Sequence, residues 1–245
     1  MENEILVSVL IFLVAFLYSS VGHGGASGYL AIMAACGIAV SVMKPTSLIL
    51  NISVSLVAFF QFYKSGYFRW NLFWPFALGS IPASFIGGNI HLEDDIYKKI
   101  LALILIFPIL RLLGAFGKSN FSGSKPLNVP LAIIIGFAIG ILSGMIGIGC
   151  GIILSPLLLL LFWANVKETA AVSALFIFVN SISGLAGHFS KNTIHFNSGI
   201  ILLLAFGITG GFLGSYIGSK KLNIVQLRIS LAVVLAAVCF KFFVF

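Results

Sequence analysis

Apolar segments fill almost the whole chain and are separated only by short breaks of glycine, proline or charged residues. They cover roughly residues 5–20, 27–42, 46–62, 70–88, 96–116, 129–143, 152–164, 169–187, 197–218 and 224–244. With 60% apolar and 8% charged residues, the 245-residue chain cannot form a water-soluble globule, in which about a quarter of the residues are charged. Because about 20 helical residues cross the hydrocarbon core, we predict an all-α polytopic membrane protein without a soluble domain.

The ten segments fall into two groups of five around a hydrophilic stretch at 117–126. The Gly-His-Gly-Gly-Ala sequence at 22–26 matches Gly-Ile-Gly-Cys-Gly at 147–151, and Lys44 and Lys167 each open the third segment of their group. This recurrence indicates an internal duplication. We predict an N-terminal repeat over 1–116, a linker over 117–128 and a C-terminal repeat over 129–245.

The odd number of segments per repeat predicts that the second repeat enters the membrane from the opposite side. With the N-terminus outside, nine basic residues lie inside and five outside, in agreement with the positive-inside rule. The inside set is Lys64, Arg69, Arg111, Lys118, Lys125, Lys167, Lys220, Lys221 and Arg228; the outside set is Lys44, Lys98, Lys99, Lys191 and Lys241. Fusing each glycine-broken pair into one span gives an alternative, eight spans with parallel repeats. The acidic start at 1–4 predicts no cleavable signal sequence.

The glycine motifs interrupt apolar segments that are too short to cross the membrane singly. Non-helical backbone at membrane depth is tolerated only where protein buries it or a wet cavity adjoins it. We therefore predict two hairpins, one from each face, whose glycine-rich tips meet near the middle of the membrane. The amides of the tips and the helix starts at Ser27 and Ile152 could bind an anion. Alternatively, the glycines only allow helices to pack closely.

Polar residues recur inside the third segment of each repeat, at Thr46, Ser47, Asn51 and Ser55 and at Ser173, Asn180, Ser181 and Ser183. Spacings of four and seven place them on one face of each helix, where they line a pathway or bind neighbouring helices. His23 is the ionisable residue of the first motif and is the candidate for proton coupling. The predicted substrate-binding set is Gly22, His23, Gly24, Gly25, Ser47, Asn51, Gly147, Gly149, Cys150, Gly151, Ser173 and Asn180.

The acidic residues, Glu2, Glu4, Glu93, Asp94, Asp95 and Glu168, all lie outside or at the edges of the apolar segments. Cation carriers usually place carboxylates within the membrane, so an anion is the favoured cargo. The three cysteines have no spacing typical of disulfides or zinc, and no hydrolase motif occurs, so we predict neither a metal, a cofactor nor an enzyme. The net charge of +8 is spread over short turns, which does not indicate nucleic-acid binding.

The chain resembles the TauE/SafE sulfite exporter family, which includes permease-like proteins for sulfonate uptake. The resemblance lies in Gly147–Gly151 with Pro156, the segment from Lys167 to Gly187, and the matching N-terminal motifs Gly22–Gly25 and Lys44–Ser47. It implies a secondary transporter of small sulfur-containing anions such as sulfite or sulfonates. Cys150 replaces a glycine that is usual in the family, and His23 is an addition to the first motif, so both departures bear on the choice of substrate.

These observations predict alternating-access transport of a sulfur-containing anion across the cytoplasmic (inner) membrane by a multi-pass protein. The anion would bind between the two glycine tips, and its partners would be the lipid bilayer and, for import, a coupled proton. Two alternatives remain open: a membrane-embedded enzyme or accessory subunit, and a passive anion channel.

Overall fold

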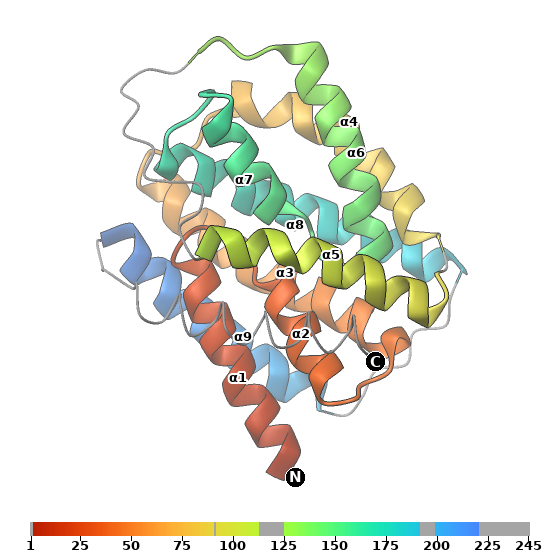
Figure 1. The fold of residues 1–245 in the computed structure, drawn as a ribbon. Coiled ribbons are helices and arrows are strands. Elements are labelled where there is room, and N and C mark those ends of the chain that lie inside the picture. Colours follow the sequence, from red (N-terminus) through yellow and green to blue (C-terminus); the bar gives the residue numbers. More distant parts are fainter. Residues whose placement is uncertain (1, 91, 113–124, 192–198, 221–245) are drawn as a thin grey trace.

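The protein is all-helical throughout the part that the computed structural model describes, residues 2–90, 92–112, 125–191 and 199–220 (Figure 1). This confirms the predicted all-α fold of a polytopic membrane protein. The helices are α1 (Glu2–Ser19), α2 (Ala26–Ala35), α3 (Val40–Lys64), α4 (Trp70–Gly88), α5 (Asp94–Leu112), α6 (Val129–Ile146), α7 (Gly151–Leu160), α8 (Val166–Lys191) and α9 (Ile200–Lys220). The tenth predicted segment and most of the predicted linker lie outside the described residues.

Four of the described helices, α3, α6, α8 and α9, are long and apolar enough to cross a membrane. The helix that follows each glycine motif is short: α2 and α7 have 10 residues each, or about 15 Å of helix. This length is about half of the hydrocarbon thickness. The prediction that the segments beside the glycine motifs are too short to cross the membrane is therefore confirmed for α2 and α7 and is wrong for α6.

The predicted boundary between the second and third segments was wrong. α2 ends at Ala35 because Gly37, with a φ of +73°, turns the chain out of the helix. α3 then begins at Val40 and includes Pro45, which we had placed in a break. Proline removes one backbone hydrogen bond, and packing within a membrane protein tolerates that loss.

The helices of the two predicted repeats are interlocked rather than side by side. The fourth helix of each repeat packs against the first and third helices of the other: α4 contacts α6 and α8, and α9 contacts α1 and α3. In Figure 1, α9 (blue) accordingly lies beside α1 (red). The third helices, α3 and α8, pack against each other at the centre. This exchange of equivalent helices is the pattern expected of a duplicated chain with an internal two-fold relation.

Glycines spaced by four line both exchanged interfaces. A Cβ on any of them would lie within 2.5 Å of a carbonyl oxygen of the facing segment, so the backbones are in direct contact. On α6 these are Gly136, Gly140 and Gly144, facing α4; on α9 they are Gly210, Gly214 and Gly218, facing α1. Small residues allow such approach in lipid, where dispersion contacts hold helices together. The glycines at these positions therefore serve close helix packing.

Polar contacts at the helix ends show the relative directions of the central helices. Arg69, just before α4, pairs with Glu168 at the start of α8, and Asn89, just after α4, accepts a hydrogen bond from Ser190 near the end of α8. α4 and α8 therefore run parallel. Phe62, near the end of α3, clusters with Ala170 and Ala171 near the start of α8, whereas Asn51 of α3 and Ser181 of α8 both lie beside Gly149, so α3 and α8 are antiparallel. The α1–α2 hairpin and the α6–α7 hairpin consequently approach the centre from opposite ends of the molecule.

Candidate functional site

The two glycine turns are buried and owe their shape to left-handed backbone. In the first turn, between α1 and α2, Gly22 and Gly25 have φ values of +77° and +97°. In the second, between α6 and α7, Gly147 and Gly149 have values of +85° and +69°, and Cys150 follows at +44°. A side chain at such φ values costs about 1–2 kcal/mol. Glycine avoids this cost and occupies four of the five positions. The thiol of Cys150 is buried despite this strain.

Both turns contain consecutive backbone N–H groups that lack an acceptor. Within the described residues, no hydrogen bond is made by the N–H groups of residues 24–28 in the first turn or of residues 148–152 in the second. Some of these amides belong to the first turns of α2 and α7, where no intrahelical carbonyl is available. Nearly all buried N–H groups in proteins are paired, so these two groups of amides are suited to binding an anion.

Asn51, at the middle of α3, lies between the two turns. A Cβ on Gly24 would lie 2.3 Å from its Oδ1, and a Cβ on Gly149 would lie 2.9 Å from its Nδ2. The Nδ2 donates to the Ile148 carbonyl at 2.9 Å, whereas the buried Oδ1 has no partner among the described residues. One helical turn earlier, Ser47 donates to the Gly147 carbonyl at 3.1 Å. The same face of α3 thus holds the second turn and contacts the first.

His23 links the first turn to the second repeat. Its Nδ1 lies 2.8 Å from the Val21 carbonyl, and because a carbonyl only accepts, Nδ1 must carry a proton. Its Nε2 lies 2.8 Å from the Ser155 hydroxyl on α7, which lies 2.7 Å from the Ser173 hydroxyl on α8. All three side chains are at most 1% exposed. A neutral imidazole would accept from Ser155, and a charged one would donate to it, so the chain of hydroxyls fits either state.

The structure separates Asn180 from the turns. Its Nδ2 donates to Ser80 of α4 and to the backbone of α8 itself, while its Oδ1 is buried without a partner among the described residues. The residues of α8 that face the turns are Ile177 and Ser181: a Cβ on Gly149 would lie 3.0 Å from the former and 2.9 Å from the Ser181 hydroxyl. Sequence reasoning missed Ser155. It also left Ser181 out of the site, although the spacing of four between Ile177 and Ser181 places both on one face of α8.

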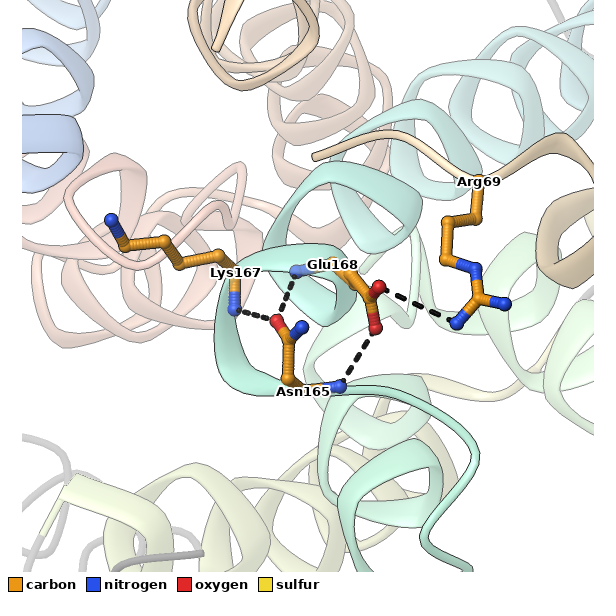
Figure 2. A network of polar contacts seen from close by, with 4 residues as sticks. All are labelled: Arg69, Asn165, Lys167 and Glu168. Atoms are coloured by element: carbon orange, nitrogen blue, oxygen red, sulfur yellow. Dashed lines mark hydrogen bonds and ion pairs between the residues drawn. The ribbon is translucent and has the colours of Figure 1, made fainter. Parts of the chain in front are cut away.

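Charged residues gather at the end of the molecule where α4 and α8 begin (Figure 2). Arg69 pairs with Glu168 at 3.4 Å, and Glu168 accepts from the N–H of Asn165, whose own side chain accepts from the N–H groups of Lys167 and Glu168. The Lys167 side chain points away from this network and donates to the Tyr67 hydroxyl at 2.8 Å. No group of three His, Cys, Asp or Glu side chains that could bind a metal occurs in the described ranges.

Comparison with known proteins identifies the family. The model of the family "Sulfite exporter TauE/SafE" matches residues 7–242. "Probable membrane transporter protein y4hK" of Sinorhizobium fredii is 36% identical over 239 residues, which cover 96% of both chains. "Probable membrane transporter protein YdhB" of Bacillus subtilis is 23% identical over 228 residues, 89% of this chain and 90% of the relative. No solved structure matches the chain. The chain therefore belongs to the TauE/SafE family and is a multi-pass membrane transporter rather than an enzyme.

Proposed function

We propose that the protein transports small sulfur-containing anions, such as sulfite or sulfonates, by alternating access. The observation that carries this proposal is the pair of buried glycine turns, each with consecutive N–H groups that have no acceptor. An anion with several oxygens on one sulfur atom can accept from more than one such group at once, and the dipoles of α2 and α7 add positive potential at the same place. The family description, sulfite exporter, supports this class of cargo.

The predicted site residues have different roles in this proposal. The amides of Gly24, Gly25, Gly149, Cys150 and Gly151 would bind the anion directly. Asn51 would set the separation of the two turns, because it is in contact with both. Gly22 and Gly147 would shape the turns through their positive φ values, with Ser47 fixing the second turn. Ser173 would act through Ser155 on His23, and Asn180 would hold α8 against α4.

Binding and release require the turns to separate from Asn51. A Cβ on Gly24 would already lie 2.3 Å from Oδ1, so the turns and the amide are in contact and leave no space between them for an anion. The bodies that move are expected to differ from the sequence repeats. Because α4 belongs with α6 and α8, and α9 with α1 and α3, each rocking bundle would combine helices from both repeats.

An interior-negative potential is sufficient to drive export. Moving one net negative charge outward gains about 2.3 kcal/mol per 100 mV, so export through the cytoplasmic membrane would need no coupled ion. Import would need one, and His23 is the proposed proton carrier because of its place between the first turn and the two serine hydroxyls. Transport whose pH dependence is the same in His23→Gln as in the wild type would refute this role.

Thermal stability of the purified protein in detergent tests the binding site. Sulfite, methanesulfonate, taurine, sulfate and chloride would be compared on the wild type, Asn51→Ala and Gly149→Ala, with Ser65→Ala as a control that lies far from the turns on the exposed end of α3. Selective stabilisation by sulfur oxyanions that the two site variants lose and the control keeps is expected. Equal stabilisation of all four proteins would place anion binding elsewhere.

A further inference from the structure

A cavity of about 370 Å³ opens at the end of the molecule opposite to the Arg69–Glu168 pair. It lies between the turn that joins α2 to α3 and the first two turns of α5, and it is of a size that commonly holds small ligands. Ala34, Ala39, Val40 and Met43 line one side. Asp94, Tyr97 and Lys98 line the other, so the walls combine apolar surface with charged groups.

Lys44 lies beside this cavity and is buried, with 7% of its surface exposed. Its Nζ is 4.4 Å from the centre of the Tyr97 ring, and Tyr97 is itself part of the cavity wall. Lys44 takes part in no ion pair with a carboxylate in the described part of the chain. A buried ammonium at the edge of an apolar segment normally has a close counter-ion or a functional role.

The Lys44 region is in contact with the second glycine turn. The Tyr97 hydroxyl donates to the Ile146 carbonyl at 3.0 Å, at the end of α6 where that turn begins. A Cβ on Gly147 would lie 3.4 Å from both the Cα and the carbonyl oxygen of Lys44. The cavity wall at Tyr97 and the backbone of Lys44 therefore both contact the start of the second glycine turn, to which the amides of residues 148–152 belong.

Lys167, the residue at the matching position of the second repeat, also lies over a tyrosine ring, at the other end of the molecule. Its Nζ lies 4.6 Å from the centre of the Tyr67 ring, compared with 4.4 Å for Lys44 and Tyr97. The two lysines differ in burial, since Lys167 is exposed and Lys44 is not. Each repeat thus places one lysine, stacked on a tyrosine, at its own end of the central helices.

From this arrangement we infer that the cavity is the entry vestibule for the anion on the α2–α3 face, and that Lys44 is the cation that attracts the anion from it toward the second glycine turn. The inference rests on the proposed transport function and adds a recognition residue that lies outside the glycine motifs. Lys98 adds positive potential at the cavity wall. The negative charge of Asp94 weakens the attraction of the cavity for the anion, so that the anion can leave again.

A cysteine at Ala39, an exposed residue of the cavity wall, reports the local potential without requiring transport. Cys36 and Cys239 would be replaced by serine, and the buried Cys150 would be kept. The measurement is the ratio of the labelling rates of two methanethiosulfonate reagents, one carrying a sulfonate and the other a trimethylammonium group. Lys44→Gln is expected to lower this anion-to-cation ratio about tenfold, because one charge at about 12 Å in a medium of effective dielectric about 40 changes the labelling rate of each reagent about threefold and in opposite directions.

Two variants keep this test specific. Lys44→Arg, which keeps the charge, should restore the ratio, and Lys99→Gln, an exposed residue of α5 that does not line the cavity, should change it less than twofold. A Lys44→Gln ratio within twofold of the parent would overturn the inference. Should Lys44→Gln fail to fold, Lys98→Gln must lower the ratio at least threefold, and an unchanged ratio there would overturn the inference as well.

Flux in proteoliposomes separates this inference from the proposed function. If the wild type carries labelled sulfite and Lys44→Gln raises the KM at least fivefold only for anion added on the α2–α3 face, the vestibule is supported. If the wild type carries sulfite and the KM of Lys44→Gln is unchanged on that face, the vestibule is refuted while the proposed function stands. If the wild type carries no sulfur anion, the proposed function fails, and protection of the Ala39→Cys thiol by methanesulfonate but not by chloride still decides the vestibule.

Discussion

Contact between Gly24 and Asn51 makes a double-mutant cycle the sharpest test of the central packing. In Gly24→Ala the new methyl group would lie 2.3 Å from Oδ1 and 3.0 Å from Cγ of Asn51, well inside the 3.4–4 Å of ordinary contact. Overpacking of this kind costs about 1–3 kcal/mol. Asn51→Ala removes both clashing atoms but leaves the Ile148 carbonyl without its donor, at a cost of about 1–3 kcal/mol.

The combined variant should be more stable than the sum of the single changes predicts. Once Oδ1 and Cγ are absent, the nearest remaining neighbour of the new methyl group is Cγ2 of Ile177 at 3.1 Å, which small side-chain adjustments can relieve. We expect a coupling energy of about 1–2 kcal/mol, measured as the free energy of unfolding in mixed detergent and SDS micelles. Gly24→Ala with Ser55→Ala is the matched control, because Ser55 lies one helical turn from Asn51 and bonds to its carbonyl. Additivity within about 0.5 kcal/mol in the Asn51 cycle would show that the first turn does not contact this side chain.

Three further predictions concern other parts of the site. Gly149→Ala should destabilise the protein by about 1–3 kcal/mol, since φ is +69° and a Cβ there would have neighbours at 2.9 Å. In Gly37→Ala, where a Cβ would have no neighbour within 4 Å, only the cost of the positive φ should remain, and thermal unfolding compares the two variants. Ser155→Ala should shift the pH profile of transport in the same direction as replacing the imidazole of the first turn, and an unchanged profile would remove the hydroxyl from the proposed proton path. Arg69→Gln should change the unfolding free energy by less than about 1 kcal/mol, because its ion pair is partly exposed. Glu168→Ala should change it by more, because it also removes the acceptor for the N–H of Asn165, and equal losses would contradict the assigned bonds.

The extent of each helix followed from the sequence where both ends carry strong breakers. The predicted segment 70–88 coincides with α4, which begins after Arg69 and ends in a Gly-Gly pair. The predicted α2–α3 boundary is wrong because it leaves Pro45 in a break between segments, whereas a proline inside a membrane helix can be compensated by packing. Local sequence signals are therefore more reliable for glycine at a helix end than for proline within a helix.

The partners of the polar residues did not follow from the sequence. Ser173 and Asn180 share a face of α8 by spacing, but seven residues separate them by about 10 Å along the axis. Over that distance the neighbouring helix changes, so Ser173 meets Ser155 of α7 and Asn180 meets Ser80 of α4. Periodicity identifies a buried polar face, whereas only the packing of the helices decides which of its members lie at the glycine turns.

The exchange of α4 and α9 between the repeats was likewise beyond sequence reasoning. Glycines spaced by four on α6 and α9 allow close helix contacts, but a row of small residues does not specify its partner. The consequence for mechanism is that cutting the chain between the repeats would not separate the moving bodies. Each bundle contains helices from both repeats, so we expect co-expressed repeats to associate before either can transport.

Counterflow in sealed proteoliposomes tests the central claim most directly. Vesicles loaded with unlabelled sulfite are diluted into labelled sulfite, and the label inside is followed over time for the wild type, Gly149→Ala and the Ser65→Ala control. The account predicts a transient accumulation of label for the wild type and the control, and its loss for Gly149→Ala. Accumulation by Gly149→Ala at the wild-type rate, or the absence of accumulation by the wild type for sulfite and for every sulfonate tested, would contradict transport of sulfur-containing anions through the glycine turns.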